Sequence, residues 1–373
     1  MMMTSIKQPK LAIWAITPHG ASLANRLADN LPDADVYVSR NLIEKKSSHI
    51  QFERLSVALK EKFRRYTGHI FIMSTGIVVR LLAPLIQSKT KDPAVVVVDD
   101  LGKNAISLLS GHIGGANELT RKIARIIEAN PVITTATDIN EIPAIDVLAM
   151  ANDLVIENPE AIQIVNMALL KGEKILVHDP FVFLADSLPH SESRTSHDFM
   201  YDINKKFQKT DIKYNPFIYI DDAIVDLPPQ VLILRPPSLV AGIGCNRDTA
   251  VEEISAHLKE VLESHRLAST SLKWLASIDV KDDEAGLIAV AESLNLPLVF
   301  FKREELNQVK GIKNPSPIVK KHVGVESVCE AAAILAARNG TLIVPKQTTQ
   351  NVTLAIARIN FSSSASARAA GII

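Results

Sequence analysis

The chain is poor in cysteine, carries no excess of either charge and has no long apolar run. Its 373 residues include two cysteines, Cys245 and Cys329, too few for a disulfide framework or a structural zinc site. Lys plus Arg and Asp plus Glu number 41 each, so no overall basic field points to nucleic acid as a partner. No apolar stretch approaches the roughly 20 residues that span a bilayer, and Leu11–Ile16 is too short for the core of a signal peptide. We therefore expect a cytoplasmic protein without a membrane partner.

The most informative segment that is present is Ser107–Thr120, with the sequence SLLSGHIGGANELT. The residues before it predict a strand, and apolar residues at the spacing of one helix face predict a helix after it. Three glycines allow positive φ and a close approach of a ligand to the backbone; they are Gly111, Gly114 and Gly115. The first amides of a helix have no partner inside that helix, so we expect the Gly111–Ala116 backbone to form an anion site.

Three polar residues of this segment are candidates for chemistry. His112 is suited to proton transfer because its ordinary pKa lies near neutral pH, although its ring could instead cap a neighbouring turn. Glu118 falls in the first turn of the predicted helix, where a carboxylate either favours the helix dipole or takes part in catalysis. Asn117 is suited to cap that helix or to orient a substrate.

The familiar nucleotide and metal motifs are missing. The spacing G-x-x-G-G fits neither G-x-G-x-x-G nor G-x-x-x-x-G-K-[ST], which disfavours a nucleotide-dependent enzyme. G-x-S-x-G is absent too, which disfavours a serine hydrolase. The ten histidines include no H-E-x-x-H, and Asp99 and Asp100 belong to a sequence typical of a turn. We therefore expect no metal site in the protein.

Short β-branched runs alternate with amphipathic segments through the first third of the chain, which is typical of an α/β protein. We expect a Rossmann-like, three-layer open sheet there, with a helical segment over Gln51–Arg64. The expected strands are Leu11–Ile16, Asp35–Val38, His69–Ser74, Ala94–Val98, Asn104–Leu109 and Pro131–Thr134. Ala94–Val98 and Asn104–Leu109 flank a short turn and predict a hairpin in an otherwise parallel sheet.

The pattern changes twice along the chain. The alternation of β-branched runs and amphipathic segments becomes less regular near residue 141, which predicts a first domain boundary. Proline pairs near residues 228–237 predict a second domain boundary. The polar segment 186–215 is typical of a mobile insertion. We divide the chain into an N-terminal α/β domain (1–140), a variable middle region (141–237), a separate C-terminal α/β domain (238–360) and a disordered tail (361–373).

Further ligand candidates follow predicted strands of the N-terminal domain. Thr75 and Gly76 follow one strand and open the helix that carries Arg80. The carboxyl end of a strand is a usual place for a ligand in open α/β sheets, and an ordinary helix cap is the alternative. Asp138 also follows a strand, and we expect it to face the same crevice.

The C-terminal domain supplies candidates of its own. Gly242 and Gly244 allow a tight strand-to-helix turn, which serves either the fold or a substrate loop. Lys281 lies in a charged loop, where a solvated helix cap is the simpler interpretation. Lys346 follows a strand, from which it could reach a carboxylate of a substrate.

Six segments in order resemble the cobalt-precorrin-5A hydrolases of anaerobic cobalamin biosynthesis. They are Ser74–Ile86, Lys91–Thr120, Pro131–Asp138, Gly242–Ile254, Leu275–Leu287 and Val323–Ala333, and they span most of the chain. SLLSGHIGGANELT is fairly specific by itself. The C-terminal domain also resembles a small stand-alone protein of the aerobic branch, which favours placing the chemistry in the N-terminal domain.

The resemblance implies a cobalt-bearing tetrapyrrole whose δ-lactone is opened by water, after which a two-carbon fragment leaves as acetaldehyde. Lactone opening needs an activated water, donors for the oxyanion and an acid for the alkoxide. We therefore expect His112 to handle the proton, Glu118 to activate or position the water, and the Gly111–Ala116 backbone to hold the oxyanion. Cobalt arrives inside the substrate, so no resident cofactor is expected, and neighbouring enzymes of the pathway are candidate partners. A non-catalytic carrier of a tetrapyrrole intermediate is the alternative function.

Overall fold

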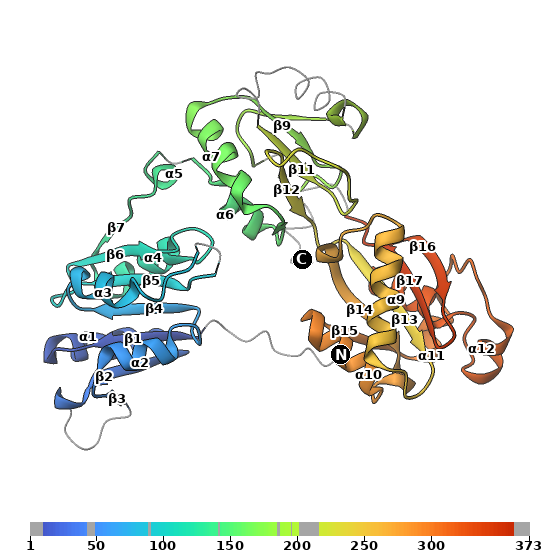
Figure 1. Cartoon of the computed structure of the whole chain (residues 1–373), viewed down its shortest axis with the longest axis horizontal. Coiled ribbons are helices and arrows are strands. Elements are labelled where there is room, and N and C mark those ends of the chain that lie inside the picture. The colour runs from blue at the N-terminus through green and yellow to red at the C-terminus, as the bar shows by residue number, and fades with distance from the viewer. Residues whose placement is uncertain are drawn as a thin grey trace. The chain divides into compact units, whose positions relative to one another are not determined.

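The computed structural model describes residues 10–42, 49–88, 91–140, 142–184, 187–194, 196–200 and 216–361. The chain divides into two compact units, Met1–Val147 and Leu148–Ile373. Three β-sheets follow one another along the chain, and Figure 1 labels most of their strands.

The first sheet has the strand order β3-β2-β1-β4-β5-β6-β7, and neighbouring strands are parallel except β5 and β6. Its strands are β1 (Leu11–Ala15), β2 (Ala34–Ser39), β3 (Ile50–Phe52), β4 (Gly68–Ile72), β5 (Ala94–Val98), β6 (Asn104–Leu109) and β7 (Asn130–Val132). The helices of this part of the chain are α1 (Pro18–Ala28), α2 (Leu55–Lys62), α3 (Thr75–Leu82), α4 (Ala116–Ile127), α5 (Ala136–Ile139) and α6 (Ile145–Ala151).

Helices cover both faces of this sheet, because successive side chains of a strand point to opposite faces. On one face Leu27 of α1 and Ile123 of α4 pack against β-strand residues that include Ile70. On the other face Leu59 of α2 and Val78 of α3 belong to a separate cluster of buried side chains. The predicted Rossmann-like, three-layer open sheet is therefore confirmed.

The predicted hairpin is confirmed as well, with Val97 of β5 opposite Ile106 of β6. Because β7 pairs in parallel with β6, both strands run against the other five. Their carboxyl ends therefore lie at the edge of the sheet where the other strands begin. The expected helical segment Gln51–Arg64 instead contains the end of β3 before α2. A strand of three residues is too short to show a period of its own, and its pairing with β2 decides its structure.

The middle region forms a five-stranded sheet with the order β10-β9-β11-β12-β8, in which only β12 and β8 pair antiparallel among the described strands. Its elements are β8 (Val155–Ile156), α7 (Ile162–Lys171), β9 (Ile175–His178), β10 (Ser191–Ser193), β11 (Phe217–Ile220) and β12 (Leu232–Arg235). Part of the predicted insertion belongs to this fold, because it contains β10 and the buried Phe199. Its residues 186, 195 and 201–215 lie outside the described residues.

The C-terminal sheet has the order β15-β14-β13-β17-β16, with β17 antiparallel to both of its neighbours. Its strands are β13 (Leu239–Cys245), β14 (Leu272–Ile278), β15 (Leu298–Phe301), β16 (Thr341–Thr348) and β17 (Val352–Arg358). Its helices are α9 (Val251–Ser264), α10 (Ala285–Leu294), α11 (Arg303–Leu306), α12 (Pro317–His322) and α13 (Val328–Ala336). Buried side chains of α9 and α10 cover one face, and those of α13 cover the other.

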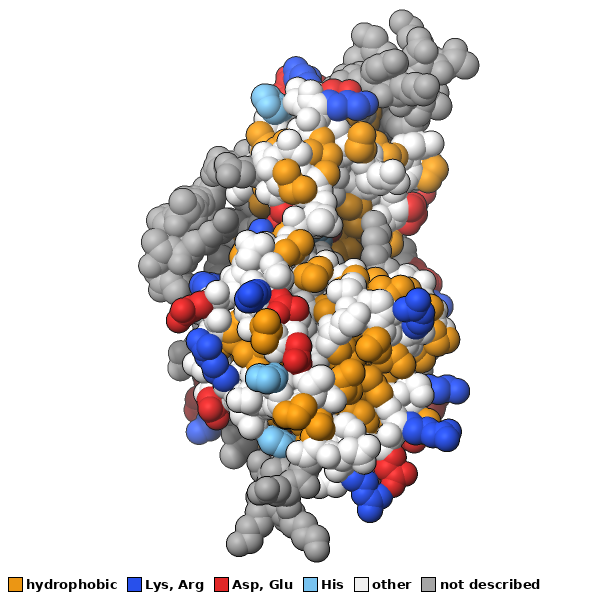
Figure 2. Space-filling model, turned by 90° about the vertical axis from the view of Figure 1, so that its left-hand side faces the viewer, with side chains coloured by type: hydrophobic (Ala, Val, Ile, Leu, Met, Phe, Trp, Pro, Cys, Tyr) orange, Lys and Arg blue, Asp and Glu red, His pale blue; other side chains and the backbone are white. Residues whose placement is uncertain are grey.

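The three sheets fall within the ranges 1–140, 141–237 and 238–360, although these boundaries remain a prediction. Residues 362–373 of the predicted disordered tail lie outside the described residues, whereas Phe361 packs on Phe181 and Phe183 with ring centroids 5.5 and 4.9 Å apart. In the part of the chain that the structure describes, no helix has the length and apolar character to cross a membrane. On the face drawn in Figure 2, basic and acidic side chains are interspersed, and neither sign of charge dominates.

Candidate functional site

The loop between β6 and α4 lies at the edge of the sheet where β6 and β7 end. Ser110 in this loop adopts a left-handed φ of 58°, an uncommon conformation for a residue with a side chain. Its hydroxyl donates to the carbonyl oxygen of Asp92 at 2.9 Å, which holds it in place. Gly115 is the N-cap of α4 with a φ of 81°, a value that glycine adopts readily. Strained loop residues of this kind cluster at functional sites.

The other glycines of the loop make room for the protein's own side chains. A Cβ atom at Gly111 would lie 2.8 Å from Oδ1 of Asn117, and one at Gly114 would lie 2.3 Å from the Cβ of Ser110. The backbone amide of Ala116 donates to the Ser110 carbonyl (3.0 Å), and that of Asn117 donates to the Gly111 carbonyl (2.9 Å). The expectation that these first amides of α4 are free for an anion is wrong, because the loop folds back and supplies their acceptors.

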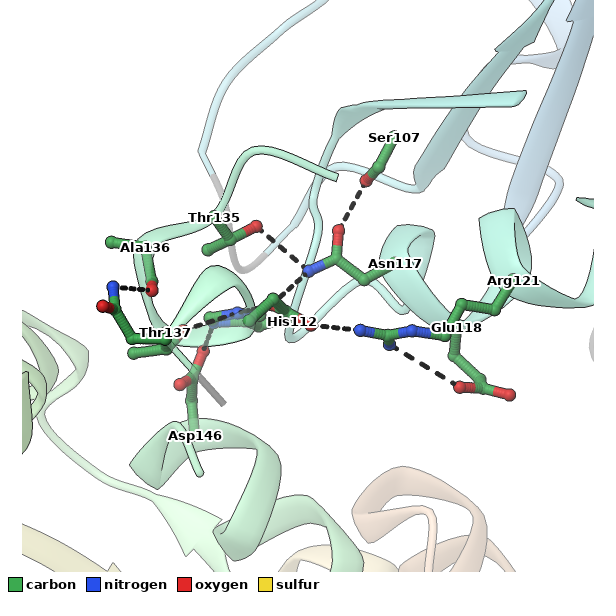
Figure 3. A network of polar contacts seen from close by, with 11 residues as sticks. Ser107, His112, Asn117, Glu118, Arg121, Thr135, Ala136, Thr137 and Asp146 are labelled. Carbon is green, nitrogen blue, oxygen red and sulfur yellow. Dashed lines mark hydrogen bonds and ion pairs between the residues drawn. The ribbon is translucent and has the colours of Figure 1, made fainter. Parts of the chain in front are cut away.

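His112 lies between two carboxylates, of which Asp146 is labelled beside it in Figure 3. Its Nε2 is 2.9 Å from Oδ2 of Asp138, and its Nδ1 is 3.2 Å from Oδ2 of Asp146. The hydroxyl oxygen of Thr137 is 3.2 Å from Nε2. The side chain of His112 is 13% exposed, so the cluster is recessed but open to solvent. The ring therefore bonds to side chains on both of its sides.

This arrangement favours the doubly protonated form of His112, because only that form donates from both ring nitrogens. The hydrogen bond to Asp146 raises the pKa of His112 above its ordinary 6.5, burial opposes the rise, and the bond to Asp138 adds to it. The raised pKa shifts the balance toward the imidazolium, and an imidazolium is a proton donor.

Asp138 is a fixed anion that orients the ring of His112. Its Oδ2 accepts from Nδ2 of Asn117 at 2.8 Å, and its Oδ1 accepts from Nη2 of Arg121 at 2.5 Å. The Ser107 hydroxyl donates to Oδ1 of Asn117 at 2.6 Å, which orients the buried amide. Burial alone would raise the pKa of Asp138, but hydrogen bonds from Arg121 and His112 bring it below its ordinary 3.8.

The structure does not place Glu118 against His112. The Glu118 side chain is 72% exposed and pairs with Arg125 at 3.4 Å and with Arg121 at 3.9 Å. In Figure 3 it lies beyond Arg121, away from the imidazole. Arg121 bonds to both Glu118 and Asp138, and it is the link between Glu118 and the cluster. The catalytic role expected for Glu118 stays a prediction.

Thr75, Gly76 and Arg80 lie at the opposite edge of the sheet from the His112 cluster. They follow β4, which runs antiparallel to β6 and β7, so their loop is about one strand length away. The expectation that Asp138 and Thr75 face one crevice is therefore wrong, and the reversal at β6 is the reason. Nη1 of Arg80 donates to the Gly76 carbonyl at 2.9 Å, so this side chain folds back on its own helix. Substrate contacts at this edge remain a prediction.

Three of the four C-terminal candidates line one cavity of about 460 Å³, namely Gly244, Lys281 and Lys346. Gly242 is explained by packing, because a Cβ atom there would lie 1.9 Å from the carbonyl oxygen of Cys329 in α13. Its expected substrate contact stays a prediction.

The side chains that could hold a metal do not converge. Among the described residues, no group of three His, Cys, Asp or Glu side chains has an arrangement that could hold a metal ion. At His112 the two carboxylates bond to opposite ring nitrogens, which keeps them apart. The expectation that the protein has no metal site or resident cofactor remains a prediction.

Models of three parts of one protein family match the chain. They are Cobalamin synthesis G N-terminal (residues 57–138), Cobalamin biosynthesis central region (143–236) and Cobalamin synthesis G C-terminus (239–357). Cobalt-precorrin-5A hydrolase of Priestia megaterium is 34% identical over 364 residues, which cover 94% of this chain and 95% of that protein. The protein of the same name from Salmonella typhimurium is 36% identical over 362 residues, which cover 95% of this chain and 99% of that protein. The chain belongs to the cobalt-precorrin-5A hydrolase family.

A shorter match was expected from the resemblance of the C-terminal domain to a stand-alone protein. Protein CobE of Sinorhizobium sp is 34% identical over 121 residues, which cover 32% of this chain and 79% of that protein. This member of the cobalt-precorrin-5A hydrolase family therefore shares about a third of its length with a separate protein.

The residues of the His112 cluster lie in two different matched regions of the cobalt-precorrin-5A hydrolase family. His112 and Asp138 fall in the N-terminal match, whereas Asp146 falls in the central match. Sequence reasoning missed Asp146 because it lies beyond the boundary expected at residue 140 and belongs to no motif. The sequence does contain a signal, because Asp146 is the one charged residue of the otherwise apolar segment Ile145–Ala151. In the structure this residue is 5% exposed. A carboxylate buried in such a segment requires a partner.

Proposed function

We propose that this chain is a cobalt-precorrin-5A hydrolase, which opens the δ-lactone of its cobalt-tetrapyrrole substrate and releases acetaldehyde to give cobalt-precorrin-5B. The observation that carries the proposal is His112 held between Asp138 and Asp146 in a chain of this family. Lactone opening needs a base for the attacking water and an acid for the departing alkoxide, and this cluster contains both. A carrier of the same tetrapyrrole would need neither group.

His112 is the acid of this proposal and Asp146 is the base. In the opening of the lactone, Asp146 takes a proton from the attacking water. Nδ1 of the imidazolium gives its proton to the alkoxide that leaves the lactone carbonyl, while Nε2 stays bonded to Asp138. Transfer of a proton from Asp146 to His112, across the 3.2 Å that separates Oδ2 and Nδ1, then restores the starting state. The backbone of residues 112–114 is the part of the loop that we assign to the oxyanion, since the amides of Ala116 and Asn117 are already used.

The residues behind the ring are positioning residues. Asp138 holds Nε2, and Asn117 and Arg121 hold Asp138, so that the Nδ1 side of the ring faces Asp146. Glu118 acts through Arg121 in this proposal, and its removal should weaken the reaction without abolishing it. Cobalt enters as part of the substrate, no resident cofactor takes part, and the reaction belongs in the cytoplasm, where neighbouring pathway enzymes are candidate partners.

The reaction is tested by incubating the purified full chain with cobalt-precorrin-5A under anaerobic conditions. Acetaldehyde is measured by coupling its reduction to NADH oxidation, and the substrate without protein gives the background rate. Release above this rate is the expected result. If the substrate binds to the protein and acetaldehyde stays at background, the chain is a carrier and the hydrolase proposal is wrong.

The site is tested by replacing each proposed proton carrier in turn. We expect His112→Gln and Asp146→Asn to lower the turnover number by at least about 100-fold, the usual scale of acid–base catalysis. Glu118→Gln should cost less than about fivefold, because its ion pairs are exposed.

The matched control is Asp33→Asn, which removes an exposed carboxylate from the same unit. It should leave the turnover number unchanged. Near-wild-type turnover in both His112→Gln and Asp146→Asn would remove this cluster from the chemistry, provided that circular dichroism shows both variants folded.

A further inference from the structure

The cavity of the C-terminal domain lies at the carboxyl ends of the parallel strands β13 and β14. Ligands of open α/β sheets usually bind at this edge. Its walls include Gly244 and Cys245 at the end of β13, Lys281 after β14, and the first turn of α13. Its volume of about 460 Å³ falls within the range of small-molecule sites, about 300–1,000 Å³.

The charge of the cavity wall has one sign. Its described lining contains two lysines and no acidic side chain. Lys281 is already neutralised, because its Nζ lies 3.1 Å from Oε2 of the buried Glu284. Nζ of Lys346 donates to the carbonyl oxygen of Asn314 at 3.0 Å, and within the described part of the chain it forms no ion pair. Lys346 is therefore a cation in the wall that lacks an anion.

The buried Glu330 fixes the position of Lys346 without neutralising it. Its Oε1 accepts from the Lys346 amide (2.9 Å) and from Nδ2 of Asn314 (2.9 Å). Its Oε2 accepts from the backbone amides of Lys313 (2.7 Å) and Asn314 (3.0 Å). Burial raises the pKa of Glu330, but these hydrogen bonds bring it below its ordinary 4.5. The carboxylate is satisfied by amide donors, and the Lys346 ammonium keeps its remaining donors for a ligand.

We infer that this cavity binds a carboxylate carried on a short apolar stem, with Nζ of Lys346 as its cation. The apolar side chains of Val280, Val328 and Val352 suit the stem. The first turn of α13 also lines the cavity, and a helix N-terminus favours negative charge. This inference rests on the proposed function, because the carboxylate is assigned to one arm of the tetrapyrrole. The C-terminal domain then holds the substrate by an arm.

The two cysteines allow the cavity to be observed without any turnover. They are the only cysteines in the sequence, and both line the cavity. Cys245 is half-buried and Cys329 is buried, and burial raises the pKa of both thiols, so labelling with N-ethylmaleimide is done at pH 8.5. The chain carries His112→Gln so that cobalt-precorrin-5A is not consumed. We expect the substrate to slow the labelling of Cys245, measured by mass spectrometry, at least about fivefold.

The cation is tested through the dissociation constant of cobalt-precorrin-5A, measured by the absorbance that co-elutes with protein. Lys346→Gln should raise this constant about tenfold or more, the usual effect of losing a charged hydrogen bond. Lys346→Arg should restore most of the affinity. The matched control is Lys259→Gln on α9, which removes an exposed lysine that pairs with Glu263 and should change nothing.

Each outcome decides the inference. Unchanged labelling of Cys245 by the substrate, or an unchanged dissociation constant in a folded Lys346→Gln, overturns it. If Lys346→Gln does not fold, the labelling comparison decides alone. Slower labelling with sodium acetate but not with cobalt-precorrin-5A means that the cavity takes a free small carboxylate, which also overturns the assignment to a substrate arm. If cobalt-precorrin-5A slows the labelling of Cys245 while the wild-type chain releases no acetaldehyde, the inference stands and the proposed reaction is wrong.

Discussion

Two histidines of the first unit, His69 and His112, have pKa values shifted in opposite directions by the groups around them. His69 is fully buried, accepts from Nε1 of Trp14 at 3.0 Å and donates to the carbonyl oxygen of Phe63 at 2.9 Å. Burial lowers the pKa of His69 to about 4, so this ring is neutral and belongs to the core. His112 instead contacts two carboxylates, and their hydrogen bonds raise its pKa despite partial burial.

The charge of His112 leads to a prediction about stability. A histidine with a raised pKa in the folded state stabilises the protein below pH 6.5, and this contribution is lost as the pH rises through the folded-state pKa. The free energy of unfolding of the wild-type chain should therefore fall more steeply above pH 6.5 than that of His112→Gln. Urea unfolding monitored by circular dichroism measures both slopes. Parallel pH profiles would mean that His112 is not held as an imidazolium.

At the residue scale, the sequence singles out His112 but not the carboxylates that contact it. His112 stood out because glycines surround it and little else explains a histidine there. Asp138 was expected near a ligand for a different reason, and Asp146 was not considered. Contacts between residues 34 positions apart depend on how β6 and β7 are placed, and no local pattern contains that information.

At the scale of elements, the hairpin of β5 and β6 decides at which edge of the sheet the His112 loop lies. Its two strands were predicted to within a residue, because β-branched runs on either side of a turn are a strong local signal. Its consequence was not predicted. The reversal separates the Thr75–Arg80 segment from the His112 loop, although both follow strands in the sequence. The edge at which a loop lies depends on strand direction, which is a property of pairing.

Close contact between β13 and α13 leads to a prediction about Gly242. Ala at this position would place its Cβ 1.9 Å from the Cys329 carbonyl oxygen and 2.6 Å from the Ala333 amide nitrogen, so the helix has to move. Gly242→Ala should destabilise the chain by about 1–3 kcal/mol or more, the usual cost of overpacking. The midpoint of urea unfolding measures this loss.

Gly76→Ala is the control for that substitution. Its Cβ would lie 3.2 Å from Nη1, at the far end of the long Arg80 side chain, and 3.9 Å from the Ser74 hydroxyl. Alanine also has a higher helix propensity than glycine. We expect an unchanged or slightly higher midpoint. A midpoint of Gly242→Ala that equals that of Gly76→Ala would show that α13 does not press on β13.

At the scale of the whole molecule, the middle and C-terminal sheets are joined by a buried ionic contact. Asp222, which follows β11, is fully buried and accepts from Nε (2.8 Å) and Nη2 (2.5 Å) of Arg358 in β17. The hydroxyl of Ser238 donates to the same carboxylate at 2.6 Å. Backbone hydrogen bonds add to this ion pair, from the Ile224 amide to the Arg266 carbonyl (2.7 Å) and from the Ala268 amide to the Asp222 carbonyl (2.8 Å). These contacts connect the two sheets within one compact unit.

The ion pair between Asp222 and Arg358 predicts that its removal destabilises both sheets together. Asp222→Ala leaves Arg358 without its buried partner and should cost about 3–5 kcal/mol. Hydrogen exchange should accelerate in both β11 and β17. The control is Asp226→Ala, whose carboxylate is 96% exposed beside Arg266 and should matter by less than about 0.5 kcal/mol. Faster exchange confined to β11 would contradict the coupling.

The position of Asp146 has a consequence for how this chain could have been assembled. The acid and the base of the proposed reaction lie on opposite sides of the border between the N-terminal and central family regions. A gene split between them would give one product with a histidine lacking its base and another with a solitary carboxylate. The proposed activity therefore requires both regions, because the 3.2 Å contact between His112 and Asp146 crosses their border.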